Sequence, residues 1–410
     1  MTSTPQPVAY VLTQHPRTTQ TFINAEIAAL RRAGREVDVF ALNEADPDQI
    51  RTDADRAEQE ATTYLKVVGV AGVFAAARRA WALSPAGLLR VVWQAVRSAG
   101  TDGRRVLWRL FHLAEALIVW DRGCDRGVEV VHAHFGQSTS TVAWLATTLG
   151  RVLECGPSEL VVTVHCGTEI EDAAETIPAL KARDARAIVA ISDHTRSQLM
   201  RHVPAEYWSS IRVIRCGIDL GRLAMPERGA IRATPTILFV GRLDPVKGVP
   251  FLLEAVGRLR DAGRSVDLEI VGGGPLESEL RAIAADSSWV RFTGELPPEA
   301  VHERLLAADV FCLPSLDEGI PVSIMEAMAV GTPVVTTAVA GIPELALDER
   351  TALVVPAGNV DSLVEALGRM LDDPELVDRL RRAARQRVEL LHDSSANLPA
   401  LIELLTDPRE

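Results

Sequence analysis

Short apolar runs rich in β-branched residues alternate along this chain with longer stretches of helical pattern, and this alternation restricts its fold more than any other feature. A continuous apolar strand followed by a helix is typical of a parallel sheet that is covered on both faces. The sequence therefore predicts an α/β fold with doubly wound sheets. The expected strands are 7–12, 37–42, 129–134, 160–165, 187–192 and 211–215, followed by 236–241, 268–273, 290–294, 309–314, 333–337 and 353–355.

These strands form two series, which a polar stretch at 226–235 separates. At 410 residues the chain also exceeds the size that a single hydrophobic core usually reaches. We expect two Rossmann-like domains that face each other across a cleft, over 1–225 and 226–390. A C-terminal helix in 391–410 is expected to pack back on the first domain. Ligands of such sheets bind beyond the carboxyl ends of the strands.

The composition excludes several classes of protein. The chain has 55 acidic and 43 basic residues, so it lacks the positive surplus that a nucleic-acid binder needs. Its five cysteines form no CxxC pair, which fits a reducing compartment. No signal peptide is apparent, and the longest apolar run, 67–77, is shorter than the roughly 20 residues of a membrane-spanning helix. We expect a cytoplasmic protein, with peripheral contact at the inner membrane face as an open alternative.

The segment 66–112 reverses the charge of this acidic protein. It carries eight basic residues and one acidic residue, with Trp81, Trp93 and Trp108 between them. A pair of helices packed on the first domain, with solvated arginines, would explain the segment. An amphipathic surface for anionic lipid or for an anionic acceptor would explain it as well, and the two interpretations are compatible.

The stretch DEGIPVSIMEAMAVGTPVV at 317–335 is the strongest candidate for a site. Pro321 suits the first turn of a helix, so Glu318 precedes the helix and Glu326 lies more than one turn inside it. Free N–H groups at a helix start attract an anion. Two carboxylates beside them would repel a phosphate unless they bind hydroxyl groups. The stretch therefore fits a ligand with a diphosphate in its middle and hydroxyl groups at both ends.

A second candidate, VGRLDPVKG at 240–248, directly follows an expected strand. Only three of the 43 basic residues are lysines, which singles out Lys247 in this glycine-flanked loop. The ammonium of Lys247 and the planar guanidinium of Arg242 can together neutralise a diphosphate. The spacing of a P-loop is absent, which disfavours an NTPase. The nearby VGGGP at 271–275 has no GxGxxG pattern and indicates a tight turn.

As a set and in this order, these motifs resemble the C-terminal domain of the retaining glycosyltransferases of family 4 (glycosyl transferases group 1), which have the GT-B architecture. The resemblance rests on GRLDPVKG, LEIVGGGPL, VRFTGEL, DEGIPVSIMEAMAVGTPVVTT and GIPEL, with Glu318 and Glu326 at the family's pair of glutamates. The stretch HPRTTQTFINAEIAALRRAG looks like the subgroup that builds bacterial exopolysaccharides. With VVHAHFG, VVTVHCGTEI, AISDHTRSQL and VIRCGIDLGRL, the resemblance covers most of the chain except about 50–125.

The resemblance implies roles for residues of the second domain, which would bind a nucleotide diphosphate sugar. Arg242 and Lys247 would neutralise the diphosphate and stabilise the leaving group, where fixed positive charge lowers a barrier most. Glu318 would bind hydroxyl groups of the donor sugar, Glu326 would bind the ribose, and the base would lie near 291–296. Neither a metal nor another cofactor is implied. The expected donor site also includes Gly241, Gly273, Leu296, Gly319, Ile320, Pro321 and Val322.

In the first domain, the resemblance implies that His165 in VHCGTEI reaches the donor sugar. Of His132 and His134, we expect only one to face the cleft, and we favour His134 for acceptor binding. A zinc site is not expected, because no third ligand is apparent. Thr18 and Thr19 lie where the first strand turns into its helix and are candidates on the acceptor side. Many relatives have a glycine-rich loop there, which this chain lacks.

The implied reaction transfers a hexose, with retention at the anomeric carbon, from a UDP- or GDP-sugar to a saccharide or lipid-linked saccharide in polysaccharide synthesis. A small natural-product acceptor is the alternative. Less favoured are a sugar-nucleotide epimerase of the same architecture, a phosphorylase and a non-catalytic partner in a synthesis complex. A phosphorylase would need a cofactor lysine, and neither Lys66 nor Lys181 has suitable surroundings in the sequence.

Overall fold

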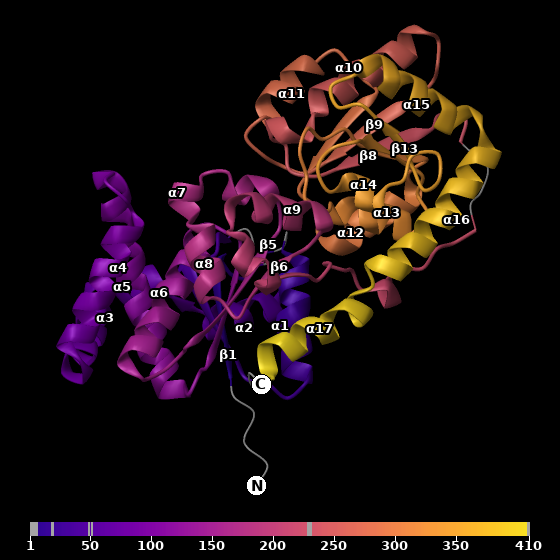
Figure 1. Cartoon of the computed structure of the whole chain (residues 1–410). Coiled ribbons are helices and arrows are strands. Elements are labelled where there is room, and N and C mark those ends of the chain that lie inside the picture. Colours follow the sequence, from indigo (N-terminus) through magenta and orange to yellow (C-terminus); the bar gives the residue numbers. More distant parts are fainter. Residues whose placement is uncertain (1–6, 18–19, 48–49, 51, 228–231, 408–410) are drawn as a thin grey trace. The chain divides into compact units, whose positions relative to one another are not determined.

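The computed structural model describes residues 7–17, 20–47, 50, 52–227 and 232–407. The chain forms two compact units (Figure 1). The first contains the chain up to Ile214 and again from Leu398, and the second contains Arg215–Asn397. The division therefore falls about ten residues before the expected 225 and a few residues after the expected 390. Within the described residues, no helix combines the length and the apolar character needed to cross a bilayer.

The first unit is built on a parallel sheet of seven strands in the order β3-β2-β1-β4-β5-β6-β7. Val8 of β1 is in register with Val37 of β2 on one side and with Val130 of β4 on the other. Six of the strands match expected runs, and β3 was not expected because two residues carry no periodic signal. The strands are β1 Val8–Gln14, β2 Val37–Asn43, β3 Thr63–Tyr64, β4 Val130–His134, β5 Glu159–Val164, β6 Ala187–Ala190 and β7 Ile211–Val213.

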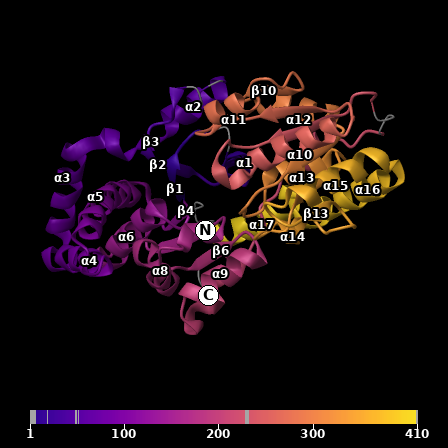
Figure 2. The ribbon, with the colours of Figure 1, turned by 90° about the horizontal axis from the view of Figure 1, so that it is seen from above.

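Helices cover both faces of this sheet. One face packs against α5 and α6 and the other against α1, and the last helix of the chain adds Leu401, Leu404 and Leu405 to that second face (Figures 1 and 2). The helices are α1 Thr21–Arg32, α2 Asp53–Ala61, α3 Leu65–Leu83, α4 Pro85–Ser98, α5 Gly103–Arg126, α6 Ser138–Leu153, α7 Ala173–Thr176, α8 Pro178–Asp184, α9 Asp193–His202 and α17 Ser394–Thr406.

The basic segment forms three helices, α3, α4 and α5, where a pair was expected. The third helix is capped at its start by Asp102, whose carboxylate accepts hydrogen bonds from the N–H groups of Arg104 and Arg105. It is capped at its end by Gly127, which adopts the left-handed conformation (φ +68°) that suits a residue without a Cβ. The helix therefore runs beyond 112, and its second half fills the core of the first unit.

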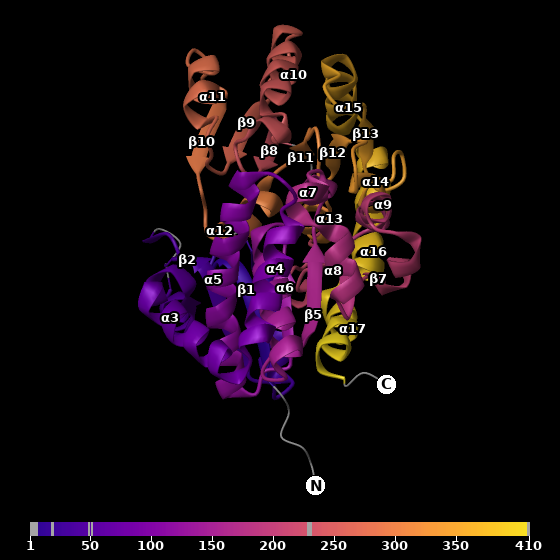
Figure 3. The ribbon, with the colours of Figure 1, turned by 60° about the vertical axis from the view of Figure 1, so that its left-hand side comes forward.

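The second unit has a parallel six-stranded sheet in the order β10-β9-β8-β11-β12-β13, and Figure 3 shows these strands side by side. All six match expected runs. The strands are β8 Thr236–Val240, β9 Asp267–Val271, β10 Val290–Gly294, β11 Val310–Leu313, β12 Val334–Thr337 and β13 Leu353–Val355. The helices are α10 Val249–Asp261, α11 Glu277–Ile283, α12 Pro298–Ala307, α13 Val322–Ala329, α14 Ile342–Leu345, α15 Val360–Asp372 and α16 Pro374–Leu391.

Both sheets reverse their strand order at one place. The chain proceeds outward from β1 to β3 and then returns to β4 beside β1, and it does the same from β8 to β10 and back to β11. The loops after the two neighbouring strands diverge there, which leaves room for a ligand at the carboxyl edge. The expected fold, two Rossmann-like doubly wound α/β domains, is confirmed, and each has one such switch point.

Candidate active site

The loops after β8 and β11 are fastened to each other at the switch point of the second unit. The N–H of Leu316 donates a 2.6 Å hydrogen bond to the carbonyl oxygen of Val246. Gly248 has a φ of +66°, and a Cβ at this position would overlap the carbonyl oxygen of Pro314. Only glycine allows both the left-handed conformation and this close approach. The two expected donor-binding motifs, 240–248 and 317–335, are therefore held side by side.

Lys247 and Glu318 form an ion pair between these two loops. The Nζ of Lys247 donates to Oε1 of Glu318, and the hydroxyl of Ser315 donates to the same oxygen over 2.8 Å. The side chains are 22% and 10% exposed, so the pair is largely shielded from water but still accessible. The side chain expected to bind a diphosphate and the side chain expected to bind hydroxyl groups are thus in direct contact.

Arg242 lies in the same loop as Lys247 but is mostly exposed. Its Nε is 3.7 Å from Oδ2 of Asp244, and the side chain is 65% exposed. The guanidinium is therefore free to turn toward an incoming anion at little cost, because an exposed ion pair at this distance is weak. Asp244 is a residue of this site that the sequence analysis missed, although it stands in the quoted motif.

The helix start after β11 offers hydrogen-bond donors. Helix α13 begins at Val322, so Pro321 is the residue before the helix and not part of its first turn as expected. Among the described residues, no acceptor meets the N–H groups of Gly319, Ile320 or Val322. The loop is held by a backbone hydrogen bond, because the N–H of Gly341 donates to the carbonyl oxygen of Glu318 over 3.2 Å. These free N–H groups can bind an anion or a hydroxyl group.

Glu326 lies one turn inside α13 and is partly buried. Burial raises the pKa of its carboxyl group to about 7. No described residue makes a hydrogen bond or an ion pair with this carboxyl group. A partly buried acid without a partner is costly unless a ligand supplies one, which makes Glu326 a candidate binding residue.

The VGGGP loop serves close packing, as its turn-like sequence predicted. A Cβ at Gly272 would overlap the carbonyl oxygen of Gly241, and one at Gly274 would overlap backbone atoms of Leu243. The N–H of Gly241 donates to Val271 and the carbonyl of Gly273 accepts from Leu243, over 3.0 and 2.8 Å. The N–H of Gly241 is therefore already used and is not a free donor for a phosphate.

The segment expected to meet the base, 291–296, includes most of β10 and the two residues after it. The guanidinium of Arg291 donates a 2.7 Å hydrogen bond to Oε2 of Glu269, so this side chain is engaged on the sheet. Leu296 is partly buried and lies beyond the end of β10, past Gly294. The base site expected at 291–296 stays a prediction.

A second polar cluster occupies the switch point of the first unit. Tyr10 from β1, Glu26 from α1, and His132 and His134 from β4 are all buried there. The rings of His132 and His134 are 4.5 Å apart, and both contact the ring of Tyr10. The expectation that only one histidine faces the ligand side is wrong, because residues two apart on a strand point to the same face. Glu26 was not singled out from the sequence.

His134 is fully buried, and both of its ring nitrogens are in hydrogen bonds. Its Nε2 is 3.0 Å from Oε2 of Glu26, and its Nδ1 is 3.0 Å from Nε2 of His165. Burial lowers the pKa of His134 to about 3. The expected acceptor-binding role therefore does not fit this side chain. Thr18 and Thr19, the other acceptor-side candidates, lie outside the described residues.

His165 follows β5 and is the half-buried end of this chain of hydrogen bonds. Its ring lies between those of Phe22 and Phe135, with centroids 4.7 and 4.9 Å away. Phe135 has a φ of +73°, an uncommon conformation for a residue with a side chain and one that accumulates at functional sites. Burial, together with His134, holds the pKa of His165 well below its usual range.

Glu169 fixes the loop that carries His165. Its carboxylate accepts hydrogen bonds from the N–H groups of Gly136, His165 and Cys166, over 2.9 to 3.1 Å. Burial raises the pKa of Glu169 to about 7, and these donors act in the opposite direction. Glu169 thus ties the loop after β4 to the loop after β5. It stands four residues after His165 in the VHCGTEI motif, so its position in the motif was the only signal.

Other candidate groups of the first unit have structural explanations. Lys181 is buried and donates to the carbonyl oxygen of Gly136 and the hydroxyl of Ser140, over 2.8 Å each, so it is not placed for a cofactor. Ligand-type atoms of Glu26, His132 and His134 lie within 4.8 Å of one another, so a third potential metal ligand, overlooked in the sequence, is present. The hydrogen bonds of Glu26 and His134 already use these atoms. Metal independence stays a prediction.

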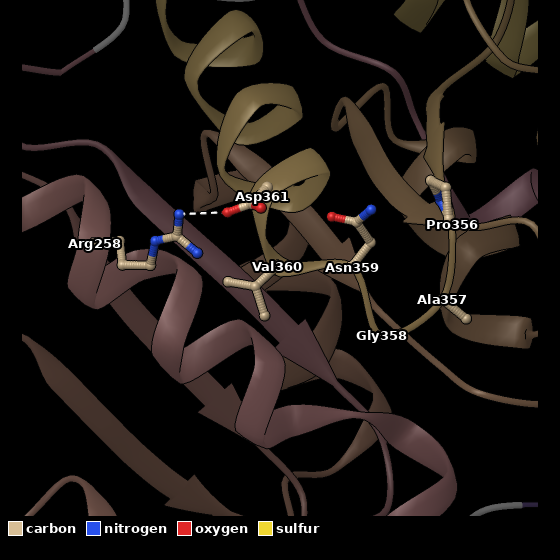
Figure 4. Close-up of a pocket in the computed structure, with 7 residues that line it drawn as sticks. All are labelled: Arg258, Pro356, Ala357, Gly358, Asn359, Val360 and Asp361. Atoms are coloured by element: carbon tan, nitrogen blue, oxygen red, sulfur yellow. Dashed lines mark hydrogen bonds and ion pairs between the residues drawn. The ribbon is translucent and has the colours of Figure 1, made fainter.

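A hollow on the surface of the second unit is separate from this site. It is lined by the loop 356–359 after β13, by the first two residues of α15 and by Arg258 from α10 (Figure 4). The guanidinium of Arg258 is paired with the carboxylate of Asp361 over 2.5 Å, so the only charges there neutralise each other. β13 is two strands away from β11. We assign no ligand to this hollow.

Comparison with known proteins identifies the family. The model of the glycosyl transferases group 1 matches residues 224–387, which contain the whole sheet of the second unit. The colanic acid biosynthesis glycosyltransferase WcaL of Escherichia coli, an assignment still provisional in its name, is 30% identical over 407 residues, which cover 94% of this chain and 95% of WcaL. The chain belongs to the group 1 glycosyl transferase family.

Two further relatives match parts of the chain. The amylovoran biosynthesis glycosyltransferase AmsK of Erwinia amylovora is 36% identical over 211 residues, which are 49% of this chain and 51% of AmsK. The alpha-D-kanosaminyltransferase of Streptomyces kanamyceticus is 28% identical over 277 residues, which are 62% of this chain and 71% of that enzyme.

Solved structures share the fold over nearly the whole chain. Sucrose-phosphate synthase from Thermosynechococcus elongatus has a TM-score of 0.69 and 22% identity, and covers 97% of this chain and 98% of its own. HepE of Anabaena in complex with UDP-glucose has a TM-score of 0.69 and 16% identity, with 97% and 99% covered. The two Rossmann-like units are thus those of a GT-B glycosyltransferase fold.

Proposed function

We propose that this chain is a retaining, metal-independent glycosyltransferase of family 4 that builds exopolysaccharide. It moves a hexose from a nucleotide diphosphate sugar to a saccharide or lipid-linked saccharide. The observation that carries the proposal is the pairing of Lys247 with Glu318 at the β8–β11 edge, beside Arg242 and open N–H groups. The polysaccharide names of WcaL and AmsK and the UDP-glucose bound by HepE support it.

The donor replaces the ion pairs between side chains of this site. The diphosphate binds the Nζ of Lys247 and the guanidinium of Arg242, which leaves the carboxylate of Glu318 free to bind hydroxyl groups of the sugar. Glu326 accepts hydrogen bonds from the ribose, which gives its carboxyl group the partner that the described residues do not provide. Two cationic side chains and two carboxylates thus match a ligand that is anionic in its middle and polyhydroxylated on both sides.

In the transfer, the bond between the anomeric carbon and the diphosphate oxygen breaks, and a bond to the acceptor oxygen forms on the same face. The departing phosphate oxygen takes the acceptor's proton, so no protein base is required. Lys247 and Arg242 stabilise the charge that develops on the leaving group. NMR of the product distinguishes the outcomes, because inversion at the anomeric carbon would refute the retaining step while leaving the donor site intact.

A thermal-shift screen of UDP-, GDP-, ADP- and dTDP-sugars tests the donor site. A donor present at 100 times its Kd stabilises the folded chain by about 2.7 kcal/mol, which is readily measured as a rise in Tm. We expect one nucleotide class to raise the Tm of the native chain and to lose that effect in Lys247→Ala. Arg258→Ala, which removes another partly exposed arginine of the second unit, is the matched control. No shift with any donor would contradict the proposal.

The support for the class of acceptor comes from the surface of α3, α4 and α5. Eleven of the seventeen large apolar side chains that are exposed among the described residues lie between 67 and 111. They recur at helical spacing, as Val70 and Phe74 do on α3, and they include all three tryptophans of the segment. The eleven are Val67, Val70, Phe74, Trp81, Leu83, Leu89, Trp93, Leu107, Trp108, Leu110 and Phe111.

The basic residues of these helices divide into two groups. Arg79, Arg105 and Arg109 are structural, since they bond to Asp121 and Asp125, to Asp172, and to the backbone of Glu175. The other five are exposed. Lys66 among them donates a hydrogen bond to Oδ1 of Asn43, and the side chains of the four arginines make no hydrogen bond or ion pair with any described residue. The exposed bases are Lys66, Arg78, Arg90, Arg97 and Arg104. Exposed tryptophans beside unpaired arginines are typical of a surface that rests on anionic lipid.

We therefore place the acceptor on a lipid at a membrane, with the protein bound peripherally from the cytoplasm. Each basic residue near an anionic surface contributes about 1 kcal/mol. Co-sedimentation with vesicles of anionic lipid should fall about tenfold or more in Arg90→Gln/Arg97→Gln, and should fall in Trp93→Ser but not in Trp208→Ser, an exposed tryptophan outside the segment. If binding does not depend on lipid charge, or if both tryptophan variants weaken it equally, α3 to α5 are not the membrane-binding surface.

A second candidate acceptor, a small natural product, is favoured by the similarity to the alpha-D-kanosaminyltransferase. In that case, α3 to α5 would serve as a packed lid and not as a membrane contact. Vesicles discriminate the two, because a natural-product enzyme would stay in the supernatant with every lipid while keeping its response to a nucleotide sugar.

A further inference from the structure

The hydrogen-bonded chain in the first unit leads from a buried acid to a half-exposed ring. Glu26 is bonded to His134, and His134 is bonded to His165, with 3.0 Å at each step. Only His165 reaches the surface, and no described residue makes a hydrogen bond with its Nδ1. The three side chains come from α1, from β4 and from the loop after β5, so the sheet brings them together from distant parts of the sequence.

The hydrogen bonds from Glu26 to His165 determine which ring nitrogens carry a proton. Burial keeps the pKa values of His134 and His165 low, so both rings are neutral near pH 7 and each has one N–H and one lone pair. An ionised Glu26 can only accept, so Nε2 of His134 must donate to it. The Nδ1 of His134 then carries a lone pair, and Nε2 of His165 must donate to that lone pair. The proton of His165 is thereby placed on Nε2.

We propose that Glu26 and His134 are positioning residues that fix the tautomer of His165 and leave the lone pair of its Nδ1 facing outward. A sugar hydroxyl group would donate to this nitrogen, a contact that rests on the proposed function. The tautomer itself does not depend on that function, since it follows from three side chains of one unit. Phe22 and Phe135 hold the ring at a fixed angle, so the lone pair has a defined direction.

The other tautomer of His134 would be less stable. If Nε2 of His134 had no proton, it would present its lone pair to the carboxylate at 3.0 Å, which is repulsive in a site shielded from water. The hydroxyl of Tyr10 donates to the same oxygen of Glu26 over 3.4 Å and does not compete for His134. His132 is engaged separately, because its Nε2 is 2.8 Å from the hydroxyl of Thr163.

Side-chain ¹⁵N NMR of the full chain labelled in histidine tests the proposal without any sugar nucleotide. At pH 8.5 Glu26 is ionised, because this value lies above its pKa of about 7, which burial has raised. With His165 assigned through His165→Gln, we expect its proton on Nε2. In Glu26→Leu, His134 loses its acceptor and should donate to His165 instead, which moves the proton of His165 to Nδ1. Glu26→Gln keeps an oxygen acceptor and should keep the native tautomer.

Two controls separate this effect from a general disturbance. Tyr10→Phe removes the other partner of Glu26 and should leave His165 unchanged. Glu58→Leu removes the carboxylate beside His15, 3.4 Å away, and should alter His15 alone. In transfer assays, Glu26→Leu should raise the donor KM about three- to tenfold, the effect of one hydrogen bond, and Glu26→Gln should restore it.

A proton on Nδ1 of His165 in the native chain would overturn the proposal, as would a folded Glu26→Leu in which the tautomer is unchanged. If Glu26→Leu does not fold, the native chain and Glu26→Gln still decide, since both must show Nε2–H. A correct tautomer in a chain that transfers no sugar would refute the proposed function and leave this inference standing.

Discussion

Replacing Glu326 by glutamine should stabilise the protein above neutral pH. The pKa of Glu326 rises from 4.5 to about 7 because the carboxyl group is buried on α13. Between these two pH values, the folded chain holds a proton that the unfolded chain has released. The stability that this proton contributes is complete below pH 4.5 and is lost as the pH rises through about 7.

The magnitude follows from the pKa difference. A difference of about 2.5, at about 1.36 kcal/mol per pKa unit, corresponds to about 3.4 kcal/mol. Because Glu326 is only partly buried, solvent reduces this value, and we expect Glu326→Gln to gain about 1–3 kcal/mol at pH 8.5 and almost nothing at pH 4. The same variant should bind the nucleotide about 10- to 100-fold more weakly, since a hydrogen bond to a charged group contributes about 1.5–3 kcal/mol.

Urea unfolding followed by hydrogen exchange in peptides of α13 measures the stability of the second unit separately from that of the first. Calorimetric titration with the nucleotide measures binding. The control is Glu303→Gln, an exposed glutamate on α12 of the same unit, which should change neither quantity. Equal free energies of unfolding for Glu326→Gln and the native chain at pH 8.5 would refute the account of burial, and unchanged binding would remove Glu326 from the ribose site.

Three further perturbations test the site. Lys247→Ala and Arg242→Ala should each lower kcat about 100-fold or more, because their charge acts on the leaving group, and near-native rates in both would remove them from the reaction. Gly248→Ala should cost about 1–3 kcal/mol in urea unfolding, because its φ of +66° is strained for alanine and the new Cβ would overlap Pro314; native stability would contradict that geometry. Glu169→Leu should leave three buried N–H groups without an acceptor and lower donor affinity through His165, whereas an unchanged thermal shift with the donor would limit Glu169 to a structural role.

Most of the architecture could be predicted from the sequence because parallel strands buried on both faces leave a strong local signal. All twelve expected strands occur, and only β3, with two residues, was missed. The third helix of the basic segment was missed for a different reason. The amphipathic pattern of α5 merges at about 112 into a fully buried stretch, where the periodicity that marks a helix disappears.

The donor-side residues could be predicted because they cluster in two short motifs, each directly after a strand. The relation between Lys247 and Glu318 could not, since 71 residues separate them and only the adjacency of β8 and β11 brings them together. Glu26 was missed for the same reason. It reads as an ordinary polar position of an amphipathic helix, and its contact with His134 spans 108 residues. Contacts of this kind depend on strand order, which local patterns do not contain.

The path of the chain makes the first unit depend on its last residues. The polypeptide leaves this unit at Ile214 and returns only at Leu398, and the returning segment supplies Leu401, Leu404 and Leu405 to one face of the first sheet. During synthesis, the N-terminal sheet therefore emerges from the ribosome with this face only partly covered, by α1, and nearly 200 residues of the second unit are translated before the rest of the cover arrives. A stop codon at position 398 would leave the entire second unit intact and yet produce a protein whose first unit exposes apolar surface and aggregates.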